Sequence, residues 1–234
     1  MNENDPTASL TSRAIRSFVI RNGRMTDGQR EAIATLMPVY GVAFCEAKLD
    51  FATLFGNDSP VWLEVGFGNG EALLHIAARF PEINFLGIEV HAPGVGHLLA
   101  GIESQALSNI RVMRHDAVDV LQHMIPADSL ARVLVFFPDP WHKKRHHKRR
   151  ILQGETITLI EKTLKIDGVL HCATDWEPYA EAMLEELGAS TLLVNQSSDG
   201  FSEKPEYRPL TRFEKRGLKL GHVVRDLLYT RVDA

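Results

Sequence analysis

A short apolar segment, followed at once by alternating glycines and then a helical pattern, limits this chain to few architectures. Residues 61–65 (VWLEV) have the composition of a buried strand, and residues 71–80 place apolar side chains on one face of a helix. Gly66, Gly68 and Gly70 lie between them, where the missing Cβ allows a tight turn and close approach of the backbone to a ligand. This strand–turn–helix unit predicts the first repeat of a parallel α/β sheet.

The same alternation of strand and helix patterns continues along the chain. Further strands are predicted at residues 84–90, 110–115, 133–137 and 169–174, and further helices at 151–165 and 176–187. Residues 133–137 (VLVFF) form the most hydrophobic run, as expected of a central strand that is buried on both faces. Residues 223–232 are predicted to be a last strand that closes the sheet. The pattern therefore predicts an α/β fold with a mostly parallel sheet and helices on both faces.

Two segments fall outside this alternation. Five arginines make the N-terminal region basic, and we predict a flexible arm over residues 1–40, followed by a single domain over residues 41–234. Residues 195–217 are polar and rich in turn-forming residues. We expect a long functional loop there, because long loops inside compact domains usually serve function.

Length and composition restrict the class of protein. With 234 residues, 44% of them hydrophobic, the chain can bury a full core as one domain. No apolar run approaches the ~20 residues of a membrane span, and the first twelve residues lack the pattern of a secretion signal. Cys45 and Cys172 match no CxxC motif and are interpreted as reduced thiols. These features predict a cytoplasmic protein without membrane contact.

Positive charge is concentrated in one place. Residues 141–150 (WHKKRHHKRR) hold six of the 26 Lys and Arg, and the remaining 20 face 30 Asp and Glu, so the rest of the chain carries −10. Trp141 can stack on a base while the cations bind phosphates, which favours a nucleic-acid site over a solvated helix face, the alternative interpretation. His142 and His146 have the spacing of metal ligands, but the Lys and Arg between them repel a cation, so we expect no metal.

Acidic residues surround the glycine turn. Glu64 precedes it, Glu89 ends the second predicted strand, where it can accept from ribose hydroxyls, and Asp116 ends the third, where it can meet an adenine edge. A dinucleotide needs a free helix N-terminus for its pyrophosphate, whereas S-adenosylmethionine carries a positive sulfonium that tolerates nearby acids. Glu64 and Glu71 flank the turn and therefore favour the methyl donor, although a simple tight turn is the alternative for a GxGxG alone.

Taken together, the motifs resemble the bacterial tRNA (guanine-N7-)-methyltransferase family over nearly the whole chain. The motifs are EVGFGNG, GIEV, RHDA, FFPDPWHKKRHHKRR, TD at 174–175 and TRFE at 211–214. The resemblance implies a Rossmann-like class I S-adenosylmethionine-dependent methyltransferase with a seven-stranded, mostly parallel sheet. It also implies methyl transfer to N7 of a guanine in the tRNA variable loop.

The resemblance also implies roles for individual residues. At the cofactor it places Glu64, Gly66, Gly68, Gly70, Glu89, Asp116 and Asp139, the last of which is also the catalytic candidate. At the substrate it places Lys143, Asp175, Thr211, Arg212, Phe213 and Glu214. In contact with RNA it places Arg145, His146, His147, Lys148, Arg149 and Arg150.

The chemistry of guanine constrains the mechanism. N7 has a free lone pair in the base plane, so it needs no deprotonation, and alignment with charge stabilisation should dominate catalysis. We therefore expect Asp139 to orient the base and offset its developing positive charge. Asp175 or Glu214 is expected to accept from the N1–H and N2–H₂ donors. The alternatives are a helix N-cap for Asp175 and an ordinary loop acid for Glu214.

Two other functions remain open at this point. A class I methyltransferase acting on a protein or small molecule predicts activity without RNA. A non-enzymatic RNA-binding protein on the same fold predicts RNA binding that does not depend on the methyl donor. An NAD dehydrogenase is disfavoured, because no hydride-transfer acid/base pair is recognisable. The sequence leaves both a monomer and a homodimer open.

Overall fold

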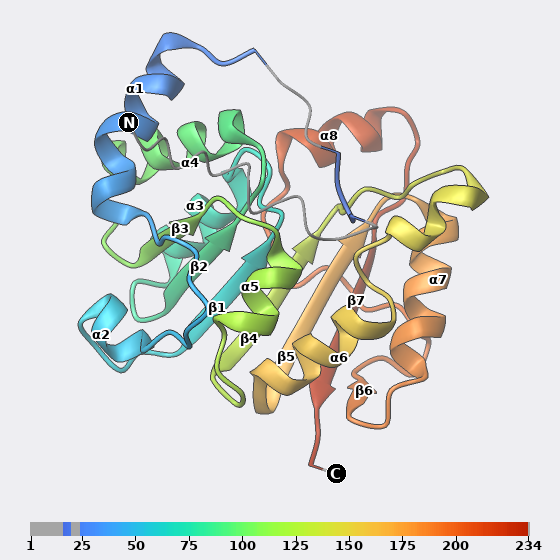
Figure 1. The fold of residues 1–234 in the computed structure, drawn as a ribbon. Helices are drawn as coiled ribbons and strands as arrows, with labels where there is room; N and C mark the ends of the chain where they lie inside the picture. Colours follow the sequence, from blue (N-terminus) through green and yellow to red (C-terminus); the bar gives the residue numbers. More distant parts are fainter. Residues whose placement is uncertain (1–15, 20–23, 234) are drawn as a thin grey trace.

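The computed structural model describes residues 16–19 and 24–233, and its centre is one seven-stranded sheet (Figure 1). The strands are β1 (Val61–Val65), β2 (Asn84–Ile88), β3 (Ile110–Met113), β4 (Leu130–Phe136), β5 (Leu164–Thr174), β6 (Leu193–Asn195) and β7 (Arg225–Arg231). Their order is β3-β2-β1-β4-β5-β7-β6. The first five strands of this order, from β3 through β2, β1 and β4 to β5, are parallel. Strand β7 pairs antiparallel with both β5 and β6. The predicted mostly parallel sheet is confirmed.

Two apolar cores lie on opposite faces of the sheet, because successive side chains of a strand point to opposite faces. Leu63 of β1 packs in one core and Trp62 in the other. The first core includes side chains of α5 (Ala117–His123), α6 (Gly154–Thr163) and α7 (Glu177–Gly188). The second includes side chains of α1 (Asp27–Tyr40), α3 (Glu71–Arg79) and α4 (Ala92–Ser104). Helices therefore cover both faces, as predicted.

The C-terminal third differs from the prediction in two respects. The last strand, β7, does not close the sheet: it inserts between β5 and β6, so that the short β6 forms the edge. The polar segment 195–217 is not all loop, because α8 (Arg212–Lys219) begins inside it. Thr211 caps this helix by accepting a hydrogen bond from the backbone N–H of Glu214. In Figure 1, α8 lies above the end of the sheet where β4 and β5 finish.

The predicted N-terminal arm includes an ordered helix. Helix α1 begins at a capping box formed by Thr26 and Gln29 and packs closely on α4. A Cβ on Gly96 of α4 would lie 2.6 Å from the backbone oxygen of Gln29, so the glycine is what permits this approach. Residues 1–15 and 20–23 of the predicted arm lie outside the described residues, and the proposed domain boundary at residue 40 stays a prediction.

No helix in the described part of the chain has both the length and the apolar character that a membrane span needs. The longest described helix, α1, has 14 residues.

Candidate active site

Two neighbouring cavities open where the parallel strands end. The smaller has a volume of about 230 Å³ and the larger about 610 Å³. Gly66, Gly68 and Phe137 line both cavities and so form a shared wall. In open α/β sheets, ligands bind outside the carboxyl ends of the strands, which makes these cavities the candidate site.

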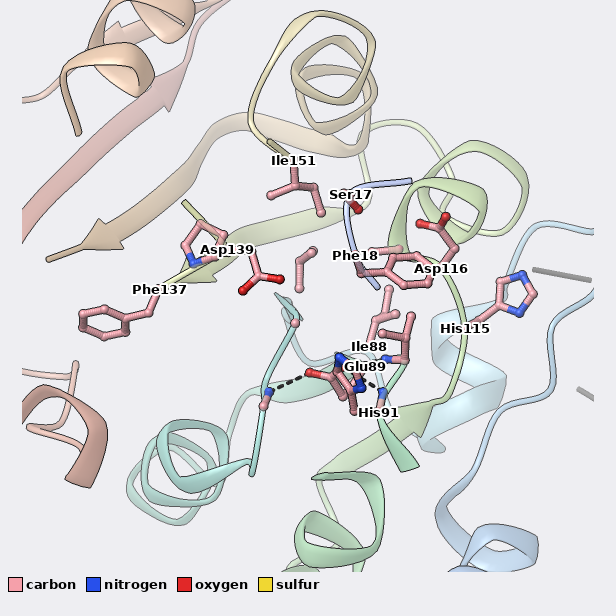
Figure 2. Close-up of a pocket in the computed structure, with 16 residues that line it drawn as sticks. Ser17, Phe18, Ile88, Glu89, His91, His115, Asp116, Phe137, Asp139 and Ile151 are labelled. Atoms are coloured by element: carbon pink, nitrogen blue, oxygen red, sulfur yellow. Dashed lines mark hydrogen bonds between the residues drawn. The ribbon is translucent and has the colours of Figure 1, made fainter. Parts of the chain in front are cut away.

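The smaller cavity is built around the carboxylate of Glu89, directly after β2. One oxygen accepts from the backbone N–H of Gly68 at 2.9 Å, and the other from those of Val90 at 2.7 Å and His91 at 2.9 Å. Figure 2 shows these bonds joining the glycine turn to the end of β2. The bonds fix the turn relative to the sheet. They leave Glu89 with spare lone pairs, which suit the predicted contact with ribose hydroxyls.

Glycine is required both in the turn and in the helix segment that packs against it. Gly66, Gly68 and Gly70 have φ angles of 71°, 59° and 76°, in the left-handed region that side chains rarely adopt. The turn is also pressed against the start of α4, where a Cβ on Gly94 would lie only 1.9 Å from the carbonyl oxygen of Gly68. Gly94 is therefore part of the site, although no motif in the HAPGVG segment distinguishes it from its neighbours.

Glu64 is the unusual acid of the site. Its side chain is 2% exposed on β1 beneath the glycine turn, and it lines the larger cavity. Among the described residues, no group hydrogen-bonds to its Oε2 atom. Burial, followed by the negative charge of Glu89, raises the pKa of Glu64 to about 8. A buried carboxyl oxygen without a hydrogen-bond partner is a feature that a polar or cationic ligand would satisfy.

Two further acids reach the smaller cavity from other strand ends. Asp116 caps α5 by accepting from the backbone N–H of Val118 at 3.0 Å, so its orientation is set by the helix. Asp139 follows β4 and is exposed at the cavity. In Figure 2 the carboxylates of Glu89, Asp116 and Asp139 come from three different strand ends. The Phe137 ring points away from the Asp139 carboxylate.

The loop that carries Asp139 has a strained backbone. Phe137 and Trp141 have φ angles of 51° and 50°, which non-glycine residues rarely adopt, and they flank the Pro138–Asp139–Pro140 segment. The Trp141 indole donates to the backbone oxygen of Ser17 at 3.1 Å. Ser17 in turn lines the smaller cavity, so the described part of the N-terminal region also contributes to the site.

The start of α8 forms one side of the larger cavity. Thr211, Arg212 and Phe213, all predicted at the substrate, line it. The backbone N–H of Arg212 donates to Glu71 at 3.1 Å, which ties α8 to the first residue of α3. The ring of Phe213 lies 5.2 Å from that of Phe137, centroid to centroid, and is 48% exposed. An exposed aromatic ring beside the cavity is suited to stacking on a base.

Glu214 does not fit the role predicted for it. Its side chain is 3% exposed, and its two oxygens accept from Arg208 at 2.7 and 3.0 Å. A carboxylate held in this way points into the protein and lines neither cavity. The hypothesis that Glu214 accepts from a guanine is therefore inconsistent with this geometry, and so is the alternative of an ordinary exposed loop acid.

Lys143 and Asp175 lie apart from both cavities. Lys143 precedes the 3₁₀ helix η2 (Lys144–Arg149) and is exposed. The Oδ2 atom of Asp175 lies 2.9 Å from Nδ1 of His222, within hydrogen-bond distance and close to the end of α8. Asp175 is not a helix cap, because α7 has Trp176 at its N-cap and no side-chain cap bond, so that alternative is wrong. The predicted substrate contacts of both residues stay predictions.

The basic segment divides into exposed and buried members. Lys143, Lys144, Arg145 and Lys148 are exposed. Arg150 is 7% exposed, donates to the backbone oxygen of Pro140 at 3.0 Å and lies over the ring of Tyr179. Arg150 therefore supports the Asp139 loop from inside, and the prediction that it contacts RNA does not fit its burial.

The histidines of this segment are arranged for packing. His142 contacts the ring of Trp176, whereas His146 contacts that of Trp141, so the two face different neighbours. Desolvation, followed by the charges of the surrounding Arg and Lys, lowers the pKa of His146. Within residues 16–19 and 24–233, no group of three or more His, Cys, Asp or Glu is arranged to hold a metal ion. The expectation of a metal-free site stays a prediction.

The fold and these cavities define a class of protein. A seven-stranded sheet of this order, with a glycine turn after β1 and acids at the ends of β2, β3 and β4, is that of a class I S-adenosylmethionine-dependent methyltransferase. The 16S rRNA (adenine(1408)-N(1))-methyltransferase from Catenulisporales acidiphilia, solved with its cosubstrate SAM, has this fold. The alignment covers 80% of this chain and 93% of that one, with a TM-score of 0.53. Because the sequence identity is only 14%, the comparison shows the fold alone.

Sequence comparison gives the particular family. A family model described as "Putative methyltransferase" matches residues 58–227. A tRNA (guanine-N(7)-)-methyltransferase of Polaromonas naphthalenivorans is 52% identical over 234 residues, covering 99% of this chain and 95% of that one. One of Klebsiella pneumoniae is 55% identical over 221 residues, 94% of this chain and 92% of that one. The chain belongs to the tRNA (guanine-N(7)-)-methyltransferase family.

The contact between Gly94 and the glycine turn can be tested by adding one methyl group. We expect Gly94→Ala to weaken S-adenosylmethionine binding about five- to a hundredfold, because overpacking of about 1–3 kcal/mol must be relieved by moving the turn. Gly28→Ala is the control, since a Cβ there meets nothing within 4 Å. Calorimetric titration of both variants measures the effect. Unchanged affinity in Gly94→Ala contradicts the inferred contact.

Glu64 predicts a pH dependence of stability. Its folded pKa of about 8 lies above the ordinary value of 4.5, so the folded protein binds more protons than the unfolded chain between these pH values. The contribution of Glu64 to stability is complete below the pKa of the unfolded chain and is lost as the pH rises through the pKa of the folded protein. We expect the free energy of unfolding of Glu64→Gln, relative to the parent, to rise across this window by up to about 1.4 kcal/mol per pH unit.

Urea unfolding of the ligand-free protein at several pH values measures this dependence. Glu46→Gln is the control, because Glu46 is exposed. If the parent and Glu64→Gln share the same pH profile, Glu64 is ionised in the folded protein and the assignment is wrong.

Proposed function

We propose that this protein transfers a methyl group from S-adenosylmethionine to N7 of a guanine in the variable loop of tRNA. The names of the two relatives described above support the reaction and the substrate class. The observation that carries the proposal is the shared wall of the two cavities, because a methyl donor and a target base must meet across a short gap. The donor occupies the smaller cavity and the base the larger one.

The residues of the smaller cavity fit the cofactor. Glu89 offers free lone pairs to ribose hydroxyls, and Asp116 lies where an adenine edge would meet it. Glu64 lines the neighbouring larger cavity, and its buried Oε2, for which no partner is found in the described structure, suits a positively charged ligand. When bound, S-adenosylmethionine supplies an electrophilic methyl group on a sulfonium. Gly66 and Gly68 then let the backbone approach the ligand closely.

Asp139 acts between the two sites. Guanine N7 attacks through its own lone pair, so the protein must align the base and stabilise the positive charge that develops on it. The Asp139 carboxylate lines the donor cavity from the strained loop, and Phe137 of the same loop lines both cavities. We infer that Asp139 orients the base electrostatically, without acting as an obligate general base.

The target base is held by α8. Phe213 offers an exposed ring for stacking, and Thr211 and Arg212 offer groups that bind sugar or phosphate. The exposed Lys143, Lys144, Arg145 and Lys148 bind the tRNA backbone. A location in the cytoplasm follows from the tRNA substrate and agrees with Cys45 and Cys172 being free thiols.

The proposed reaction is tested with labelled S-adenosylmethionine and unmodified tRNA transcripts. We expect label at N7 of one variable-loop guanine, and no label when that guanine is replaced by adenine. Labelling of a protein or small molecule without RNA supports the first rival function. RNA binding that is indifferent to S-adenosylmethionine, with no label transferred, supports the non-enzymatic one.

The role of Asp139 is tested by Asp139→Asn, which removes the charge and keeps the shape. We expect the single-turnover rate to fall about 10²–10³-fold, the usual loss for one preorganised electrostatic group. The dissociation constant for tRNA should change less than about twofold, because the phosphate contacts lie elsewhere. Asp58→Asn, at an exposed surface position, is the control. A normal rate in Asp139→Asn removes this residue from the mechanism.

A further inference from the structure

A buried network of polar side chains lies beneath the larger cavity, centred on Arg208. Arg208 is 1% exposed and is among the largest fully buried side chains in the described structure. Its guanidinium donates to Asp226 of β7 from Nε at 2.6 Å and from Nη2 at 2.8 Å. It also donates to Glu214 of α8 from Nη1 at 2.7 Å and from Nη2 at 3.0 Å. One cation thus joins the sheet to the helix through two bidentate pairs.

The sheet side of this network is fixed by a second set of bonds. His171 of β5 is fully buried, and its Nε2 lies 2.7 Å from Asp226. Its Nδ1 lies 2.6 Å from the hydroxyl of Tyr207. Because the carboxylate can only accept, the bonding pattern assigns the proton to Nε2 and makes Nδ1 the acceptor from Tyr207. Asp226 of β7 is therefore also bound to His171 of the adjacent strand β5, which fixes the carboxylate that accepts from Arg208.

The other side of the network reaches the site itself. Glu214 is in the first turn of α8, next to Phe213, whose ring contacts Phe137. The Arg208 guanidinium also lies 5.7 Å from the centroid of the Phe137 ring. Arg208 therefore contacts both the helix that presents the stacking ring and the strained loop that presents Asp139.

We propose that Arg208 is a positioning residue that fixes α8 and Phe137 in the arrangement required for methyl transfer. This inference rests on the proposed function, because it assigns the larger cavity to the target base. The planar guanidinium can bond two carboxylates at once, whereas a lysine ammonium in the same place cannot reproduce both bidentate pairs. Burial of all three charged groups makes the geometry of α8 depend on this one side chain.

A conservative substitution, Arg208→Lys, tests the proposal. We expect affinity for S-adenosylmethionine within about threefold of the parent, because Arg208 does not line the smaller cavity. We expect the single-turnover rate at saturating tRNA to fall at least about tenfold, since small misplacements of reacting groups carry losses of this order. Hydrogen exchange of residues 212–219 should rise, while exchange of residues 225–231 stays slow.

Two further variants make the result specific. Glu214→Gln removes the charge on the α8 side alone and should slow the single turnover by a similar factor. The double variant Arg208→Lys/Glu214→Gln should be no slower than the slower single variant, because the two residues act through one another. Arg225→Lys is the matched control. Arg225 directly precedes Asp226 but forms an ion pair with Glu177 at the surface, so this variant should leave the rate unchanged.

The outcomes separate this inference from the proposed function. If the parent methylates tRNA and Arg208→Lys turns over normally, or the losses in the double variant multiply, the positioning role is overturned and the proposed function stands. A loss of rate that follows only the unfolded fraction, and disappears on cooling, assigns Arg208 to stability alone and also overturns it. If the parent does not methylate tRNA, the proposed function fails, and unchanged hydrogen exchange of α8 in Arg208→Lys then refutes the positioning role independently.

Discussion

The carboxylate of Glu89 is the contact on which the donor side of the site depends. It accepts backbone N–H groups from Gly68 of the glycine turn and from Val90 and His91, the two residues that follow it, so the turn and the segment between β2 and α4 meet on one side chain. The turn can come this close because Gly68 adopts a left-handed conformation and because Gly94 has no Cβ. The ends of β1 and β2 and the start of α4 are thereby fixed around one cavity before any ligand arrives.

The acceptor side depends on a different kind of contact. Arg208 joins β7 to α8 through two buried carboxylates, and its guanidinium lies against Phe137 of the strained loop after β4. Phe137 links the two halves, because its neighbour Phe213 belongs to α8 and its loop carries Asp139. The donor side thus rests on backbone hydrogen bonds and the acceptor side on charged side chains, and the two meet at one wall.

The parts of this structure that the sequence could predict are those set by local patterns. The strand β1, its glycine turn and α3 follow from apolar periodicity and left-handed backbone positions. The insertion of β7 between β5 and β6 depends on pairing between distant segments, and the eight-residue helix α8 begins inside a polar stretch rich in turn-forming residues. The acids around the turn were recognisable by position, whereas the burial of Glu214 and Arg150 was not, because burial of a charge depends on partners from distant segments.

The most direct test is a structure of the protein bound to S-adenosylhomocysteine and unmodified tRNA. The nucleoside should lie against Glu89 and Asp116 in the smaller cavity, and a variable-loop guanine should lie against Phe213 in the larger one. N7 of that guanine should point across the wall formed by Gly66, Gly68 and Phe137 toward the sulfur. A guanine bound elsewhere, or one whose N7 faces away from the sulfur, would contradict the proposal that methyl transfer takes place across this wall.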